Sequence, residues 1–176
     1  MLKKIALIVV VLISAVLAYA ATKPDTFRVQ RSAHIKATPE LIFPHIDTLT
    51  NWAAWSPWEK LDPAMKKAPS GPVSGKGAVY EWDGNTDVGT GRMEITESTP
   101  PSRIMIKLDF LKPFEAHNQA EFALERVGDA THVTWAMFGP QPYLMKVMGL
   151  FINCEKMVGK DFEAGLANLK TIVEKT

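Results

Sequence analysis

The chain has 176 residues, and its 20 lysines and arginines against 19 aspartates and glutamates leave a formal charge of +1 at neutral pH. These charges are scattered, without the basic stripe that phosphate binding requires, so we expect no nucleic-acid partner. The only cysteine, Cys154, excludes an intramolecular disulfide framework, and it lies far from the amino-terminal position that a lipoprotein anchor requires.

An apolar run follows two lysines at the amino end. Lys3 and Lys4 precede it, and the run extends from Ile5 to Ala21 with only Ser14 and Tyr19 as interruptions. A hydrocarbon core about 30 Å thick takes roughly 17–25 apolar helical residues, so this run is just long enough to span a membrane. Positive charge before the run predicts a cytoplasmic amino end and an exported remainder.

The same segment also fits a cleaved signal peptide, because Ala18-Tyr19-Ala20 matches the small-residue pattern of a cleavage site. The apolar core of a signal peptide usually has about 7–15 residues, and the greater length here favours a retained anchor. We expect residues 1–22 to be the anchor or signal segment, with residues 5–22 in the membrane, residues 23–26 a spacer, and residues 27–176 one domain. The expected location is the cell membrane, with a single pass, or the secreted or periplasmic space after cleavage.

The expected domain begins with a strand and short helices. The alternating pattern from Phe27 to Ile35 is typical of a strand. Thr38 and Pro39 supply a capping residue and a proline at the first helical position, which predicts a helix start. A second short helix or turn is expected from Leu49 to Trp55.

The middle of the chain alternates between strand patterns and turn residues. Asp83-Gly84-Asn85 is a hairpin signal of this kind. Evenly spaced short strands joined by tight turns indicate an antiparallel, strongly curved sheet. The expected strands are Gly77–Trp82, Gly91–Ser98, Arg103–Phe110, Ala116–Glu125 and Thr131–Phe138.

Beyond Gly139-Pro140-Gln141-Pro142, apolar residues recur at intervals of three, four or seven. This spacing predicts one long amphipathic helix of about eight turns. Gly149, Gly159 and Gly165 lie within it, and each lowers helix propensity but permits a bend or a close approach. The apolar positions are Leu144, Met148, Phe151, Val158, Phe162, Leu166, Leu169 and Val173.

This order of elements resembles the helix-grip fold of the START and birch-pollen-allergen superfamily (SRPBCC), in its polyketide cyclase/dehydrase-like branch. The resemblance covers roughly Phe27 to Glu174 and implies an α+β fold, in which a curved antiparallel sheet wraps around a long C-terminal helix. It also implies a deep cavity between sheet and helix that holds an apolar ligand, and it supplies no universal catalytic motif. The motifs that carry it are Arg31-Ser32-Ala33-His34-Ile35 with Thr38-Pro39-Glu40, Trp52-Ala53-Ala54-Trp55-Ser56-Pro57-Trp58, Gly89-Thr90-Gly91-Arg92-Met93-Glu94-Ile95, and Gly159-Lys160-Asp161-Phe162-Glu163-Ala164-Gly165-Leu166.

Aromatic and methionine side chains on the inward strand faces are the candidates for the cavity wall, because they suit irregular apolar ligands. The tryptophans at 52, 55 and 58 either grip the ligand at the cavity mouth or cap the core beneath the short helices. The residues expected to contact the ligand are Trp55, Trp58, Tyr80, Trp82, Met93, Phe110, Asn118, Trp135, Met137 and Phe151.

The polar residues near these strands give little sign of catalysis. Alternation places Arg92 and Glu94 opposite Met93, on the solvent face, where they form an ordinary surface pair. Asn118 alternates with the apolar set and is expected to point inward, where it needs a hydrogen-bond partner.

No metal, cofactor or catalytic residue is expected. Asp83, Asn85, Asp87 and Glu94 match positions of a calcium-binding loop, but Val88 stands where that loop requires glycine. The histidines lack zinc-ligand spacing, and no G-x-S-x-G nucleophile motif is present.

The leading hypothesis is a membrane-tethered or exported domain that binds a hydrophobic small molecule, such as a lipid, a quinone or a polyketide-like compound. The first alternative is a cyclase, dehydratase or isomerase, which predicts an ionisable group with a shifted pKa in the cavity. The second alternative is an envelope protein-interaction module, which predicts an exposed patch of indoles.

Overall fold

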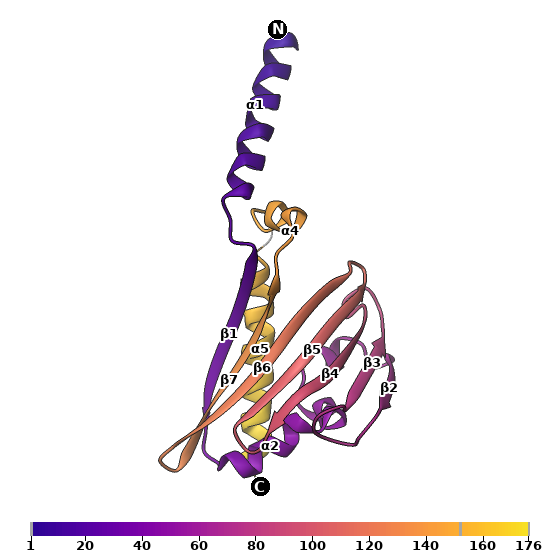
Figure 1. Ribbon diagram of the computed structural model, residues 1–176, viewed down its shortest axis with the longest axis vertical. Coiled ribbons are helices and arrows are strands. Elements are labelled where there is room, and N and C mark those ends of the chain that lie inside the picture. Colours follow the sequence, from indigo (N-terminus) through magenta and orange to yellow (C-terminus); the bar gives the residue numbers. More distant parts are fainter. Residues whose placement is uncertain (1, 152, 176) are drawn as a thin grey trace.

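The computed structural model describes residues 2–151 and 153–175 and shows an α+β domain behind a projecting apolar helix (Figure 1). Met1, Ile152 and Thr176, which belong to the expected segments, lie outside the described residues. The helix, α1 (Leu2–Ala21), is long and apolar enough to cross a membrane, and almost none of it is buried against the domain. A signal sequence near the amino end has the same properties.

The elements behind α1 confirm the expected order of strand, short helices, antiparallel strands and C-terminal helix. They are β1 (Thr26–Ile35), α2 (Pro39–Asp47), the 3-10 helix η1 (Leu49–Ala54), α3 (Trp58–Leu61), β2 (Lys66–Ser70), β3 (Val79–Asp83), β4 (Thr90–Thr99), β5 (Arg103–Lys112), β6 (Ala116–Val127), β7 (Ala130–Pro140), α4 (Tyr143–Met148) and α5 (Cys154–Val173).

Within the described residues, seven strands form one antiparallel sheet in the order β1-β7-β6-β5-β4-β3-β2. The sheet curves around α5, as the helix-grip arrangement requires (Figure 1). The first strand pairs with the last along its whole length, from Thr26 opposite Pro140 to Ile35 opposite Thr131. β2, an edge strand, was not predicted from the sequence, because all its side chains are exposed and no alternation marks it.

The core lies between the concave face of the sheet and α5. Alternate residues of each central strand point into it, and on β6 and β7 Phe122 and Val133 are fully buried. Phe162, Leu166 and Leu169 form the matching face of α5. Apolar residues at every second position of the strands therefore pack, in one layer, against apolar residues at helical spacing on α5.

The prediction of one unbroken C-terminal helix from Leu144 to Val173 is wrong. The Gly149 N–H donates to the carbonyls of Met145 and Val147 and ends α4, while the Asn153 side chain accepts from the Lys156 N–H and caps the start of α5. These local hydrogen bonds outweigh the apolar spacing. Residues 144 and 151 consequently lie outside the long helix, and both side chains are exposed.

Two glycines of α5 allow the helix to lie close to the sheet, as predicted. A Cβ atom on Gly165 would stand 2.8 Å from Cζ3 of Trp135 and 3.3 Å from Cδ of Pro57. A Cβ atom on Gly159 would instead meet the guanidinium of Arg31, at 2.1 Å from Nη2. The neighbour at 165 is thus a packed ring, whereas the neighbour at 159 is the end of a flexible side chain.

Gly165→Ala should make the domain less stable than Gly159→Ala, by about 1–2 kcal/mol. Both substitutions gain up to about 1 kcal/mol of helix propensity. Alanine at 165 overpacks a rigid indole, while Arg31 can move away from alanine at 159 and lose only partly exposed ion pairs, which contribute little. Chemical denaturation of both variants measures the difference, and equal unfolding midpoints would contradict the close packing at Gly165.

Candidate functional site

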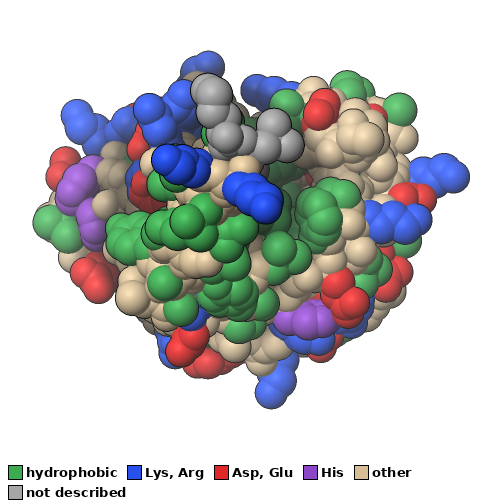
Figure 2. Space-filling view, turned by 90° about the horizontal axis from the view of Figure 1, so that it is seen from above, with side chains coloured by type: hydrophobic (Ala, Val, Ile, Leu, Met, Phe, Trp, Pro, Cys, Tyr) green, Lys and Arg blue, Asp and Glu red, His purple; other side chains and the backbone are tan. Residues whose placement is uncertain are grey.

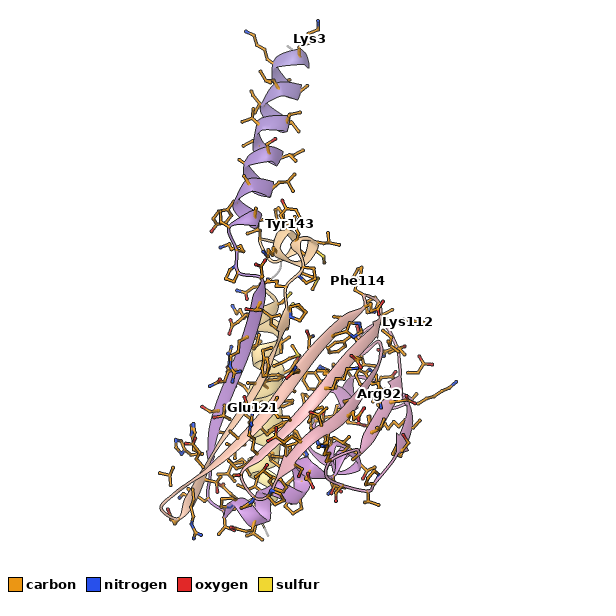
Figure 3. All side chains as sticks on the ribbon, in the orientation of Figure 1. Lys3, Arg92, Lys112, Phe114, Glu121 and Tyr143 are labelled. Carbon is orange, nitrogen blue, oxygen red and sulfur yellow. The ribbon has the colours of Figure 1, made fainter. Side chains whose placement is uncertain are left out.

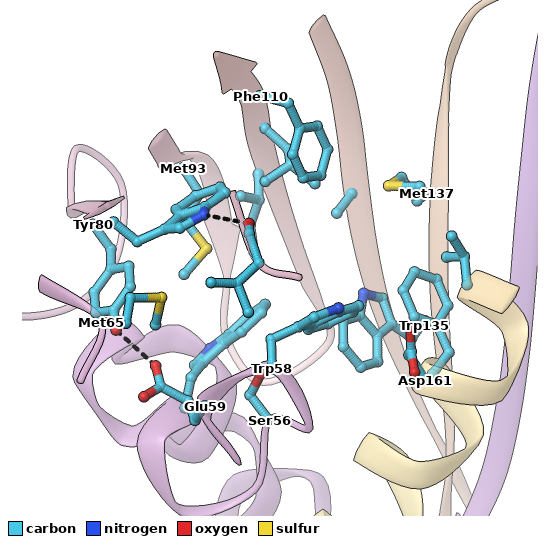
Figure 4. A pocket seen from close by; sticks show the side chains of 18 of the residues that line it. Ser56, Trp58, Glu59, Met65, Tyr80, Met93, Phe110, Trp135, Met137 and Asp161 are labelled. Carbon is cyan, nitrogen blue, oxygen red and sulfur yellow. Dashed lines mark hydrogen bonds between the residues drawn. The ribbon is translucent and has the colours of Figure 1, made fainter. Parts of the chain in front are cut away.

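A cavity of about 240 Å³ lies between the concave face of the sheet and the first half of α5 (Figure 4). Strands β3 to β7 supply one wall, α5 supplies the facing wall, and the segment from η1 to β2 closes one side. Most of the lining is apolar. The sheet and the helix therefore do not fill the space between them completely, and the unfilled part suits an apolar guest.

Most of the residues predicted to contact a ligand line this cavity. They come from separate strands whose alternation points them to the same side, and Figure 4 shows them facing a common space. These residues are Trp58, Tyr80, Trp82, Met93, Phe110, Trp135 and Met137.

The structure places the other three predicted residues elsewhere. Trp55 is fully buried behind the cavity, where its Nε1 donates to the His45 carbonyl at 2.9 Å. Asn118 is buried, but its side chain lies against the backbone of Gly139. Phe151 lies beyond α4 and is 75% exposed.

The two interpretations of the tryptophan cluster apply to different members. Trp55 belongs to the core, and the Nε1 of Trp52 donates to the Ile46 carbonyl at 2.9 Å, so both indoles are fixed to α2. Trp52 and the half-buried Trp58 border the cavity. The cluster therefore both caps the core and contributes to the cavity wall.

The core is closed at one end of the sheet and open at the other. On β5, Ile104 is fully buried whereas Phe110 is only half-buried. On α5, Leu169 is likewise fully buried whereas Val158 is only half-buried. Phe110 pairs with the first residue of β6, at the end of the sheet where β1 begins and β7 finishes. The cavity thus lies toward the end of the domain from which α1 projects (Figure 1).

An ionisable pair that the sequence did not reveal lies at the cavity wall. Tyr80 donates to Oε1 of Glu59 at 2.7 Å, and Lys67 pairs with the other carboxylate oxygen. Burial and this hydrogen bond raise the pKa of Tyr80, which keeps the phenol protonated at neutral pH. Glu59 follows Trp58 in α3, and no motif marks it as a cavity residue.

Asp161 and Trp135 each carry a polar group without a partner among the described residues. Asp161 of α5 lines the cavity without any hydrogen bond or ion pair, and burial raises the pKa of its carboxyl. Trp135 is 2% exposed, and its Nε1 is buried without an acceptor. A buried unpaired donor costs about 1–3 kcal/mol of stability, and this nitrogen is enclosed by its neighbours.

Other polar residues have ordinary structural roles. Arg92 and Glu94 form the predicted surface pair, with 2.8 Å between Nη2 and Oε2. In the turn before β4, the side chain of Asn85 accepts from the backbone N–H groups of Asp87 and Val88. This hydrogen bonding explains the residues that resembled a calcium-binding loop.

Asp161→Asn should raise the free energy of unfolding at pH 7, by less than about 1 kcal/mol because the carboxyl is only partly buried. The folded state raises the pKa of this carboxyl, so the charged form at neutral pH opposes folding. The advantage of asparagine should disappear as the pH falls through the raised pKa and Asp161 becomes protonated. Urea unfolding between pH 4 and 8 measures this, and an advantage independent of pH would contradict it.

Comparison with known proteins agrees with this geometry. A family model described as polyketide cyclase/dehydrase and lipid transport matches residues 26–174, from the start of β1 to just beyond the end of α5. No curated protein is found to be similar to the chain.

Solved structures share the fold at low sequence identity. Protein MLL2253 from Mesorhizobium loti superposes with a TM-score of 0.63 at 12% identity, over 85% of this chain and 98% of that one. The Aha1 dimer from Colwellia psychrerythraea gives 0.58 at 18% identity, over 84% and 96% of the two chains. The di-domain ARO/CYC BexL from the BE-7585A biosynthetic pathway gives 0.61 at 18% identity, over 89% of this chain and 53% of that one.

Proposed function

Since the chain belongs to the polyketide cyclase/dehydrase and lipid transport family, we propose that it binds a hydrophobic small molecule in the cavity between its sheet and α5. The observation that carries this proposal is the cavity itself, to whose wall four strands and α5 contribute aromatic or methionine side chains. Burial of apolar ligand surface supplies the affinity, and the few polar groups fix the orientation.

The size and polarity of the cavity narrow the class of ligand. Its volume of about 240 Å³ lies just below the range of about 300–1,000 Å³ that is usual for small-molecule sites. It therefore suits a compact ring system, or one part of a longer molecule such as a quinone, a lipid or a polyketide-like compound. Met93 and Met137 can adapt to an irregular shape.

We further propose that α1 is retained as a membrane anchor, with the domain outside the cytoplasm. The hydroxyl of Tyr143 donates to the carbonyl of Leu17 at 2.7 Å, and Ala20 is fully buried at the base of the helix. Next to this contact, Lys146 donates to Oδ1 of Asp25 at 2.5 Å. A helix that is bonded to the domain near its carboxyl end behaves as part of the folded protein, which supports an anchor over a removable signal.

A proton-transfer enzyme is the second candidate, because the cavity contains the ionisable group that this alternative predicts. Asp161 lines the cavity, has no partner among the residues described, and has a raised pKa. A carboxylate of this kind can accept a proton from a bound ligand and return it. The protein-interaction alternative gains no such support, since Trp52 and Trp55 are buried.

Ala120→Leu should greatly reduce ligand uptake while the fold is kept. Ala120 is buried at the cavity wall, so the larger side chain occupies the space that the ligand needs. Ala123→Leu is the matched control, because Ala123 lies half-exposed on the other face of the same strand. Full-length chain in detergent is incubated with a membrane lipid extract, and bound molecules are identified by native mass spectrometry.

Wild type and Ala123→Leu should carry an apolar compound, and Ala120→Leu about tenfold less, the factor that about 1.4 kcal/mol of affinity produces. Equal loading of all three proteins, or no apolar compound in any of them, would contradict binding in this cavity. The second candidate is tested in the same samples with Asp161→Asn. If the domain is an enzyme, the wild type should release a product that differs in mass or in chromatographic retention from the compound retained by Asp161→Asn.

A further inference from the structure

Large apolar side chains are exposed around the base of α1. Figure 2 looks onto this end of the molecule, with the apolar side chains of α1 nearest the viewer. The exposed apolar side chains of the domain itself come from the end of β5, the β5–β6 turn, α4 and the segment after α4, and together we call them the anchor-end face. Its members are Leu111, Phe114, Tyr143, Leu144, Met145 and Phe151.

The contact between α4 and α1 fixes the height of this face relative to a membrane. α1 has 20 residues, which at about 1.5 Å per residue gives about 30 Å, the thickness of the hydrocarbon core. Leu17, which accepts the hydrogen bond of Tyr143, lies four residues before the end of α1 and therefore about 6 Å inside that end. A membrane that covers α1 consequently reaches α4, and tyrosine is a residue typical of the membrane interface.

The charged side chain of α4 points inward and not to its outer surface. Lys146, the basic residue of α4, is 7% exposed and pairs with Asp25 of the spacer. Leu144 and Met145 remain on the outside, and Phe151 follows at 75% exposure. The outer surface of α4 is therefore apolar and uncharged, which suits lipid better than water.

The β5–β6 turn supplies the other side of the face. Figure 3 shows Phe114 at the end of the sheet that lies toward α1, though further from the helix than Tyr143. Membrane-spanning helices tilt by about 20° on average, within a range of about 0–40°. A tilt toward β5 and β6 brings Phe114 and Leu111 to the same bilayer surface as α4.

We infer that the anchor-end face docks on the outer leaflet of the membrane that α1 crosses. The cavity lies toward the same end of the domain, so its mouth then faces lipid, and an apolar ligand can pass between bilayer and cavity without crossing water. This inference rests on the proposed retention of α1, and it adds a second, reversible contact to the covalent tether.

Single-cysteine variants of the full chain test the inference. The exposed Cys154 is replaced by serine, and cysteine is introduced by Phe114→Cys, Leu144→Cys or Val127→Cys. Val127 is the matched control, because it is an exposed apolar residue at the β6–β7 turn, at the other end of the sheet. Each variant carries a polarity-sensitive fluorophore and is reconstituted in nanodiscs of phosphatidylcholine with spin-labelled acyl chains.

The spin label should lower the emission at 114 and 144 by about twofold or more, and leave the emission at 127 unchanged. Absence of quenching at either 114 or 144 overturns the inference, and so does an intact mass showing that chain isolated from cell membranes lacks α1. Ligand loading of the same samples is measured separately. Loading without quenching refutes docking alone, whereas quenching without loading refutes the proposed binding function alone.

Discussion

The contact between the sheet and α5 is the interaction on which the rest of the structure depends. At its centre the indole of Trp135 lies parallel to the ring of Phe162, with centroids 4.1 Å and planes 8° apart. Phe122 stacks against Trp135 at 4.9 Å, so the helix is joined through two rings to the middle of the sheet. Where α5 and the curved strands diverge beyond this stack, apolar side chains do not meet across the gap, and the cavity occupies the space. The same contact thus holds the domain together and sets the inner limit of the candidate site.

Sequence patterns predicted the elements whose two faces have different environments. β6 shows this most simply, because Ala120, Phe122 and Leu124 are buried and their neighbours are not. The side chains of β2 are exposed on both faces, so its sequence has no alternation of apolar and polar residues to detect. The break between α4 and α5 escaped prediction for another reason. Phe151 keeps helical spacing, but hydrogen bonds at Gly149 and Asn153 end one helix and begin the next. Capping depends on single residues, so the spacing of apolar residues does not reveal it.

The candidate site was predictable where strand alternation determines the face of the sheet to which a side chain points. Tyr80, Met93 and Met137 line the cavity because each occupies an inward position on its strand. Glu59 and Asp161 reach the cavity through the packing of α3 and α5, which depends on tertiary contacts that a single sequence does not display. Asn118 shows the limit of alternation, since it is buried as expected but lies against Gly139 of the neighbouring strand and not against the cavity.

The pairing of β1 with β7 has a consequence for the way the chain reaches its native state. β1 follows the apolar helix directly and is synthesised first, yet its partner is the last strand to be made. Until β7 is available, β1 has an open edge, and α5, which also packs across it, does not yet exist. Contacts between segments so far apart in the chain form slowly, because a long loop must be closed before they stabilise anything. The domain therefore cannot assemble progressively from its amino end, and cooperative closure of the sheet around α5 must wait until β7 and α5 have been synthesised.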